Sequence, residues 1–270
     1  MKYAILSDIH ANLEAFSVVL EKCRAIGVTH YICLGDIVGY NADPKACLAL
    51  LRSLNPVAVV KGNHDEYISN SDESMEGFNA HAKSAVLWSK KQLDDSEKKY
   101  LASLPMKQVI RGTPITVVHA TLDSPAEWGY IFDVHHAADN FSYQFTQLCF
   151  CGHSHVPIAF VKRPVTGRNE PQITQIADWG WKADEFETGY RIGEEDEIVI
   201  PVEPACKYLI NVGSVGQPRN RDPRASFAVY DSEEKTVTRW RLPYDIATTQ
   251  DKIRAAGLPE RLAVRLEIGS

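Results

Sequence analysis

The first 65 residues alternate between short apolar runs and longer amphipathic segments. A run such as Tyr3-Ala4-Ile5-Leu6 has no polar side, which is typical of a strand buried on both faces of a parallel sheet. The amphipathic segments repeat apolar residues at helical spacing; the first ends at Gly27 and the second begins at Pro44. The predicted elements are strand 3–7, helix 13–26, strand 30–34, helix 44–54 and strand 57–60. This βαβαβ order predicts a parallel sheet with right-handed crossovers.

A polar segment and a helical insertion come next. Residues 66–78 are rich in Ser and Glu and show no periodicity, which indicates a loop. From about residue 78 to residue 104 the pattern predicts one or two helices, with Asp94-Asp95-Ser96-Glu97 as the N-cap between them. We expect this insertion to act as a helical cap, because its apolar stripe needs a surface to cover. The elements predicted after it are strand 115–118, helix 133–147 and strand 148–151.

Short strands and turns dominate from Val156 onward. We expect these strands to form a second, more antiparallel sheet that packs on the first. They are predicted at 158–161, 172–176, 198–202, 208–212, 227–230 and 237–242. The tail, from about residue 245 to residue 270, predicts closing helices, and the acidic run 184–196 is typical of a solvated loop. No linker separates these parts, so the sequence predicts a single α/β domain over residues 1–270.

Composition narrows the class of protein. With 44% hydrophobic and 24% charged residues, a chain of 270 residues can build a full core. No apolar stretch reaches eighteen residues, and the N-terminus runs directly into a predicted strand, so we expect no membrane association and a cytoplasmic location. A net charge of −6 argues against a stable nucleic-acid partner. The six cysteines lie mostly in apolar segments without Cys-x-x-Cys spacing, which predicts buried, reduced thiols.

Residues that can bind a divalent metal follow five of the predicted strands. Any one of them has an ordinary structural explanation, since a lone histidine at a strand end is usually a hydrogen-bonded core residue. The conjunction of clusters after successive strands favours a metal site, because the carboxyl ends of strands in an α/β fold meet at one crevice. The candidate ligands are Asp8, His10, Asp36, Asn63, His119, His153 and His155.

The order of these clusters resembles the calcineurin-like metallophosphoesterase superfamily. The motifs are Asp8-x-His10, Gly35-Asp36-x-x-Gly39, Gly62-Asn63-His64-Asp65, His119 and Gly152-His153-x-His155. Three further segments resemble a bacterial cytosolic branch of small phosphodiesterase-like proteins: residues 39–44, 211–219 and 256–259. The resemblance implies a sandwich of two mixed β-sheets flanked by helices, in agreement with the predicted elements.

The same resemblance implies a dinuclear metal centre and a reaction. One ion would be held by Asp8, His10 and His155, a second by Asn63, His119 and His153, and Asp36 would bridge them. The ligands suit Mn, Fe, Zn, Co or Ni, with Mn favoured. A hydroxide between the ions would attack phosphorus in line and hydrolyse a small phosphodiester or nucleotide.

Further residues have a functional and a structural interpretation. By the resemblance, His64 would protonate the leaving oxygen and Asp65 would orient its ring; alternatively, His64 only orders its loop. In the Gly-rich segment 211–219, Asn211, Ser214 and Arg219 could bind a phosphate, or the segment could be a turn between strands. Trp179, Trp181 and the histidines outside the motifs, His81 among them, are expected to serve in packing or at the surface.

One departure from the family concerns substrate class. The protein Ser/Thr phosphatases and the symmetrical dinucleoside tetraphosphate hydrolases carry Asp-Arg-Gly after the bridging motif, whereas this chain has Gly35-Asp36-Ile37-Val38-Gly39-Tyr40 and lacks the arginine. The missing arginine favours small phosphodiesters and leaves those two activities as alternatives. A catalytically silent scaffold of the same fold is the non-enzyme alternative, and the retention of all seven ligands argues against it. The oligomeric state has no signal in the sequence.

Overall fold

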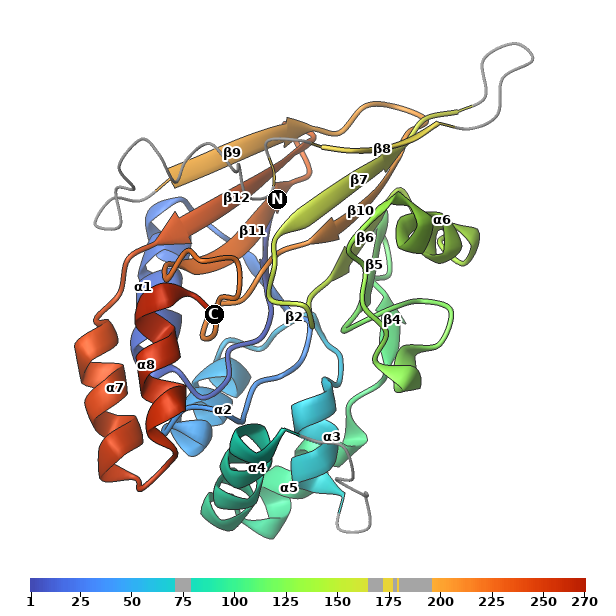
Figure 1. Ribbon diagram of the computed structural model, residues 1–270. Helices are drawn as coiled ribbons and strands as arrows, with labels where there is room; N and C mark the ends of the chain where they lie inside the picture. Colours follow the sequence, from blue (N-terminus) through green and yellow to red (C-terminus); the bar gives the residue numbers. More distant parts are fainter. Residues whose placement is uncertain (71–78, 165–171, 177–178, 180–195) are drawn as a thin grey trace.

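Two six-stranded β-sheets lie face to face, and helices cover their outer sides (Figure 1). The computed structural model describes residues 1–70, 79–164, 172–176, 179 and 196–270. Trp181, Phe78 and residues 184–195 of the acidic run lie outside this part of the chain. The observed architecture confirms the prediction of two mixed sheets flanked by helices.

The first sheet has the strand order β3-β2-β1-β11-β12-β9. Its parallel part repeats the predicted βαβαβ order, with Tyr3 of β1 opposite His30 of β2. On its other side β1 pairs antiparallel with β11, where Tyr3 is opposite Tyr230. The strands are β1 (Lys2–Leu6), β2 (His30–Cys33), β3 (Ala58–Val59), β9 (Asp196–Pro201), β11 (Ala225–Asp231) and β12 (Thr236–Leu242).

The second sheet has the order β4-β5-β6-β10-β7-β8. Strands β5, β6 and β10 are parallel to one another, while β4, β7 and β8 pair antiparallel with their neighbours. The strands are β4 (Lys107–Val109), β5 (Ile115–Val118), β6 (Leu148–Cys151), β7 (Ile158–Lys162), β8 (Ile173–Gln175) and β10 (Lys207–Asn211).

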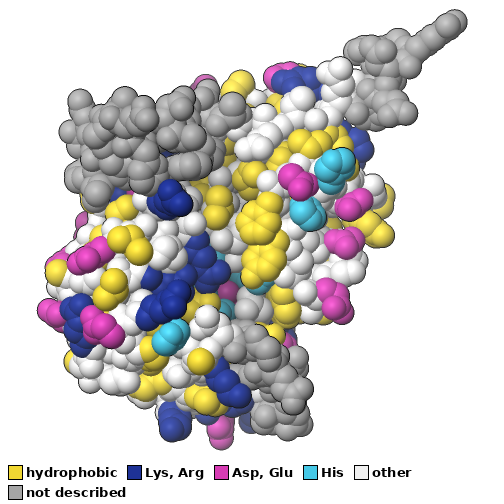
Figure 2. Space-filling model, in the orientation of Figure 1, with side chains coloured by type: hydrophobic (Ala, Val, Ile, Leu, Met, Phe, Trp, Pro, Cys, Tyr) yellow, Lys and Arg dark blue, Asp and Glu magenta, His cyan; other side chains and the backbone are white. Residues whose placement is uncertain are grey.

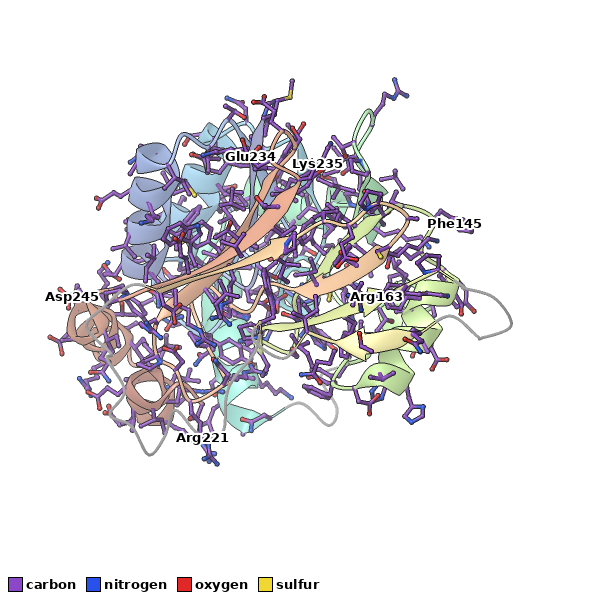
Figure 3. All side chains as sticks on the ribbon, turned by 90° about the horizontal axis from the view of Figure 1, so that it is seen from above. Phe145, Arg163, Arg221, Glu234, Lys235 and Asp245 are labelled. Atoms are coloured by element: carbon purple, nitrogen blue, oxygen red, sulfur yellow. The ribbon has the colours of Figure 1, made fainter. Side chains whose placement is uncertain are left out.

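The predicted division of strands between the sheets is wrong. Strands from the second half of the chain do not form a sheet of their own: β9, β11 and β12 extend the first sheet, and β7, β8 and β10 join β4–β6 in the second. The apolar pattern shows that a strand is buried but does not identify its neighbour. Figure 3 shows the β11–β12 hairpin from above, with Glu234 and Lys235 at its turn.

Alternate residues of the central strands belong to different cores. Ile5 and Ile32 point between the two sheets, where they meet Phe150 and Ile210 of the second sheet. Leu6, beside Ile5 in the chain, points outward into the layer beneath the helices. Both faces of β1 are therefore buried, which explains why its sequence is continuously apolar instead of alternating.

Helices cover both outer faces and one end of the sheets (Figure 1). Apolar residues of α1 (Leu13–Ala25) and α2 (Pro44–Ser53) pack on the first sheet, and α6 (Val134–Ser142) packs on the second. The predicted closing helices are α7 (Ile246–Ala255) and α8 (Glu260–Ile268). Figure 3 shows Asp245 at the start of α7, where its side chain accepts a hydrogen bond from Thr248.

The predicted insertion is formed by two helices, α4 (Ala80–Gln92) and α5 (Asp95–Ser103). Asp94 is the N-cap of α5, as predicted, and forms a capping box with Glu97. The loop predicted at 66–78 is wrong in its first part, because Asn63–Ser69 is a helix, α3. Two further elements were not predicted, the strand β4 (Lys107–Val109) and the single-turn helix η1 (Pro125–Glu127).

Two other predictions concern buried residues. All six cysteines are buried and free, which confirms the expected thiols. Trp179 is fully buried between the sheets and donates a hydrogen bond from Nε1 to the backbone oxygen of Asn211 at 3.0 Å, in keeping with a packing role. Within the ranges that the structure describes, no helix has the length and apolar character to cross a membrane.

Candidate metal centre

All seven predicted ligands lie at one end of the two sheets. Each follows the carboxyl end of a parallel strand: Asp8 and His10 follow β1, Asp36 follows β2, Asn63 follows β3, His119 follows β5, and His153 and His155 follow β6. All seven side chains are buried. The sheets therefore bring together residues that are up to 147 positions apart in the chain, from Asp8 to His155.

The backbone is strained at this cluster. Positive φ angles, which residues other than glycine rarely adopt, occur at five of the seven residues. They are Asp8 (52°), His10 (47°), Asp36 (51°), His153 (67°) and His155 (60°). Each such conformation costs on the order of 1–3 kcal/mol and is typical of functional sites. At these three strand ends, stability has therefore been given up for a particular direction of the side chains.

The Asp36 carboxylate lies at the centre of the cluster. Its Oδ1 accepts a hydrogen bond from the backbone N–H of His64 at 2.8 Å, which fixes the direction of the carboxylate. Its Oδ2 is 3.4 Å from His10 Nε2 and 3.5 Å from His119 Nε2. One oxygen atom is thus shared by two histidines from different sheets.

On one side of Asp36 lies a compact group of four residues. Ligand atoms of Asp8, His10, Asp36 and His155 are all within 4.8 Å of one another. Asp8 Oδ1 is 3.2 Å from His155 Nε2, while its Oδ2 accepts hydrogen bonds from Ser7 Oγ and from the backbone N–H of His153. One oxygen of Asp8 is held by the protein and the other faces the group.

Asn63, His119 and His153 lie on the other side of Asp36. Asn63 Oδ1 is 3.3 Å from His119 Nε2, and the rings of His119 and His153 are 5.1 Å apart. His153 Nε2 is buried and has no hydrogen-bond partner within the described part of the chain. An unsatisfied nitrogen buried beside a carboxylate is costly unless something binds it.

Three of the histidines are oriented by backbone carbonyl groups. A hydrogen bond at Nδ1 leaves Nε2 as the acceptor that faces the cluster, which is the arrangement that metal-binding histidines use. The pairs are His10 with the oxygen of Val38 at 3.1 Å, His119 with that of Leu34 at 2.8 Å, and His155 with that of Gln217 at 2.5 Å.

The carboxylates and histidines of the cluster shift one another's pKa values. Burial alone would raise the pKa of Asp36, but His119 and His64 hold it well below its ordinary value. Burial lowers the pKa of His153 to about 3, so its ring is neutral at pH 7. His119 behaves differently: burial opposes its protonation, but the carboxylates of Asp36 and Asp8 and the hydrogen bond to the Leu34 oxygen together raise the pKa of His119 to about 9. The carboxylates are therefore ionised, as metal ligands must be.

The residues present fit a divalent metal. Carboxylate, amide and imidazole atoms converge at this strand end, and Asp8 Oδ1 and His153 Nε2 lack hydrogen-bond partners in the described structure. Mixed nitrogen and oxygen ligands suit first-row transition metals, and the donor set alone does not select one of them.

Asp65 supports the backbone around Asp36. Its Oδ2 accepts hydrogen bonds from the backbone N–H groups of Asp36 and Gly62, and its Oδ1 accepts one from that of Ile37. These contacts join the end of β2 to the start of α3, and the orientation of the His64 ring by Asp65 stays a prediction. Gly62 is required there, because a Cβ atom would overlap the Asp36 carboxylate.

Asn211 and Ser214 lie behind the cluster. Asn211 Nδ2 donates to the backbone oxygen of Gly152 at 2.5 Å and to Ser154 Oγ at 3.0 Å. Ser214 Oγ donates to the backbone oxygen of Asp8 at 2.8 Å. Both side chains are buried and neither lines the cavity described next, so a direct contact with substrate stays a prediction.

A cavity of about 450 Å³ opens in front of the cluster. His64, Tyr40 and Arg219 lie on its wall beside the metal-binding residues. Arg219 donates a hydrogen bond from a terminal nitrogen to Tyr40 Oη at 2.9 Å, and the Tyr40 ring is 4.5 Å from that of His64. Arg219, from the segment after β10, therefore brings a guanidinium group to the cavity wall beside Tyr40 and His64.

Several cavity residues were not identified from the sequence. They are Asn79, His81 and Ala82 at the start of α4, Tyr130 in the segment after η1, and Arg261, Leu262 and Arg265 on α8. His81 was expected to serve in packing or at the surface. Arg261 and Arg265 are four residues apart, a spacing that places both on one face of a helix but does not distinguish them from other surface residues.

Comparisons with known proteins agree with this geometry. A metallophosphoesterase from Sphaerobacter thermophilus has a crystal structure that matches with a TM-score of 0.78 at 38% identity, over 100% of this chain and 99% of that one. Hypothetical protein PH1004 from Pyrococcus horikoshii OT3 shares the fold, with a TM-score of 0.75 at 20% identity over 100% and 98% of the two chains.

Sequence comparisons identify a relative and a family of this chain. The uncharacterized protein MJ0912 of Methanocaldococcus jannaschii is 37% identical over 268 residues, which are 98% of this chain and 97% of that protein. The model of the calcineurin-like phosphoesterase superfamily domain matches residues 1–177, which contain all seven candidate ligands. The chain therefore belongs to the calcineurin-like phosphoesterase superfamily.

Proposed function

We propose that this chain is a metal-dependent phosphoesterase with two metal ions, acting on small phosphodiesters or nucleotides. The observation that carries the proposal is the position of Asp36 Oδ2, at 3.4 Å from His10 Nε2 and 3.5 Å from His119 Nε2. A carboxylate oxygen between two imidazole nitrogens can bridge two cations. The family relationship supports the same reaction class, hydrolysis of phosphoester bonds.

Each group of residues would have a defined task. One cation would be held by Asp8, His10 and His155, and the other by Asn63, His119 and His153, with Asp36 shared. Two divalent cations in such a site polarise a phosphoryl group and activate water for in-line attack. The backbone carbonyl groups at Nδ1 of His10, His119 and His155 would hold the rings in position during turnover.

His64 and Arg219 would act on the substrate. His64 lies on the cavity wall, with its ring 4.8 Å from that of His10, where it can reach a leaving oxygen. Burial lowers the pKa of His64 to about 4 despite the attraction of Asp36, and a bound phosphate adds negative charge that works in the opposite direction. Arg219, which lies close enough to depress this pKa, would bind a phosphate oxygen.

The cavity walls favour small substrates. Residues of α4 and α8 flank the opening, in keeping with the predicted helical cap. Tyr130 stacks on His153 with ring centres 4.4 Å apart and also on Phe132 at 5.4 Å. Tyr130 is 45% exposed and Phe132 is 51% exposed, so an aromatic surface suited to a nucleobase lies next to the site.

An activity screen tests the proposed function. We expect protein reconstituted with Mn, Fe, Zn, Co or Ni to hydrolyse bis(p-nitrophenyl) phosphate and nucleotide diesters, and protein treated with a chelator to be inactive. Long double-stranded DNA and an intact phosphoprotein are expected to be poor substrates, because α4 and α8 border the cavity. Inactivity on every small ester with every metal would contradict the proposal and favour the scaffold.

Metal binding should also release protons. In metal-free protein the nearby carboxylates, Asp36 above all, raise the pKa of His119 to about 9, in spite of burial, so His119 is protonated at pH 7 and must lose a proton to bind metal. Burial and Asp36 raise the pKa of Asp65 to about 7, which adds a fraction of a proton. Calorimetry of Mn binding in buffers of different ionisation enthalpy should show about one proton more released at pH 7 than at pH 10, where His119 is already deprotonated and only metal-bound water can release a proton. Equal proton release at the two pH values would contradict the assignment of His119.

A further inference from the structure

Three arginine side chains line the cavity on the side of α8. Arg261 and Arg265 are four residues apart on α8, and Arg219 approaches from the segment after β10. In Figure 2 a dark-blue patch borders the central hollow, inside which cyan and magenta side chains are visible. The cavity thus has a strongly basic wall beside the candidate metal centre.

This positive charge is not neutralised within the described residues. None of the three guanidinium groups forms an ion pair with a side-chain carboxylate in that part of the structure, although the protein as a whole is acidic. Arg219 Nε is buried and has no hydrogen-bond partner there. Burial, together with the repulsion of Arg219, lowers the pKa of Arg265 to about 10. Apart from the Ser270 oxygen that accepts a hydrogen bond from Arg265, the described residues offer these charges no anionic partner, which is costly, and a bound anion would remove that cost.

The Tyr40 ring lies between two of the arginines and the candidate metal ligands. Its ring centre is 4.6 Å from that of His10 and 4.5 Å from that of His64. Its other neighbours are Arg219 and Arg265, whose guanidinium carbons each lie 5.5 Å from the centre of the ring. Both arginines interact with the Tyr40 side chain, but Arg219 also lies close enough to His64 to lower its pKa, whereas Arg265 donates its Nε–H to the backbone oxygen of Ser270.

The arginines of α8 lie in the same cavity as the candidate metal centre but at a different part of its wall. Building on the proposed function, we infer that the enzyme prefers phosphoesters that carry a second, non-scissile phosphate group, and that Arg261 and Arg265 bind this group while the scissile phosphate lies at the metal-binding residues. A guanidinium group matches the geometry of phosphate oxygens and can bind two of them at once. Two arginines four residues apart on one helix face can grip a single phosphate from the same side.

A matched pair of chromogenic substrates tests the inference. Thymidine 5′-(p-nitrophenyl phosphate) and its 3′-phosphorylated form share the leaving group and differ only in the second phosphate. We expect kcat/KM to be about 10- to 100-fold higher for the 3′-phosphorylated form, as two charge-assisted hydrogen bonds allow. Adenosine 3′,5′-bisphosphate should likewise inhibit at least about tenfold more tightly than adenosine 5′-monophosphate.

Variants assign the preference to α8. In the double variant Arg261→Gln/Arg265→Gln the ratio of kcat/KM between the two substrates should fall to about one, whereas Arg265→Lys should retain part of it. Arg111→Gln, at the exposed turn between β4 and β5, is the matched control and should keep the full ratio. Metal content measured on each protein verifies that the fold and the metal centre are intact.

Different results would contradict the second phosphate site and the proposed phosphoesterase function. If the parent hydrolyses both substrates with equal kcat/KM and binds both adenosine phosphates equally, the second phosphate site is disproved and the proposed function stands. If neither substrate is hydrolysed with any metal, the proposed function fails. A thymidine diester that carries a 3′-succinate instead of the phosphate should show a much smaller gain, and an equal gain would show a general anion site and overturn the inference of phosphate.

Discussion

Asp36→Asn should lose at least about 10³-fold in kcat/KM towards bis(p-nitrophenyl) phosphate, the upper range for loss of a single electrostatic group, because one carboxylate serves both halves of the centre. Asp36 Oδ2 lies between His10 and His119, so an amide at this position would present a weaker ligand to two cations at once. The backbone hydrogen bond from His64 to Oδ1 can persist with an amide oxygen. The fold should therefore survive while metal affinity falls.

The control for this substitution removes a carboxylate elsewhere. Asp139 is exposed on α6, away from the cavity, and Asp139→Asn should leave turnover and metal content unchanged. Metal analysis after extensive dialysis provides the second measurement. If Asp36→Asn kept two equivalents of tightly bound metal and normal turnover, Asp36 would not be the bridging ligand.

His64→Ala should slow esters with poor leaving groups much more than p-nitrophenyl esters. An alkoxide or ribose oxygen needs a proton as its bond to phosphorus breaks, whereas p-nitrophenolate can leave without one. A positioned general acid contributes about 10²–10⁴-fold, and we expect a loss of this size for nucleoside or alkyl diesters alone. The measurement is kcat for both substrate types at equal metal content.

The outcome for His64 separates two roles. His64 lies beside Tyr40 and Arg219 on the cavity wall and is buried, with its ring 4.8 Å from that of His10. A residue that only orders this wall should affect both leaving groups by the same factor. An equal loss with intact metal would therefore rule out proton donation and leave His64 a positioning residue.

The strands and the candidate metal ligands were accessible to sequence analysis because both are local features. An apolar run such as that of β1 must be buried on both faces, and a polar residue directly after it must lie at the strand end. The strand partners were not accessible, because β1 pairs with β11, more than 200 residues later, and no local pattern records that pairing. Helix α3 was missed because polar residues at a metal site, Asn63 among them, also form its first turn.

Sequence analysis identified only some of the residues on the cavity wall. Arg219 was identified because its segment carries a recognisable motif, whereas Arg261 and Arg265 lie on a helix whose sequence resembles that of any amphipathic surface helix. Their importance follows from position: α7 and α8 fold back along α1 and place one face of α8 beside Tyr40. For Asp65 the motif predicted that its carboxylate orients the ring of His64. The structure adds hydrogen bonds to backbone N–H groups, which no local pattern in the sequence indicated.

The central claim is that Asp36 bridges two cations. Crystals of the protein grown with Mn and measured at a wavelength where Mn scatters anomalously would test it most directly. We expect two peaks about 3.5–4 Å apart, one beside Asp8, His10 and His155 and the other beside Asn63, His119 and His153, with the Asp36 carboxylate between them. A single peak, or two peaks that do not share Asp36, would contradict the account.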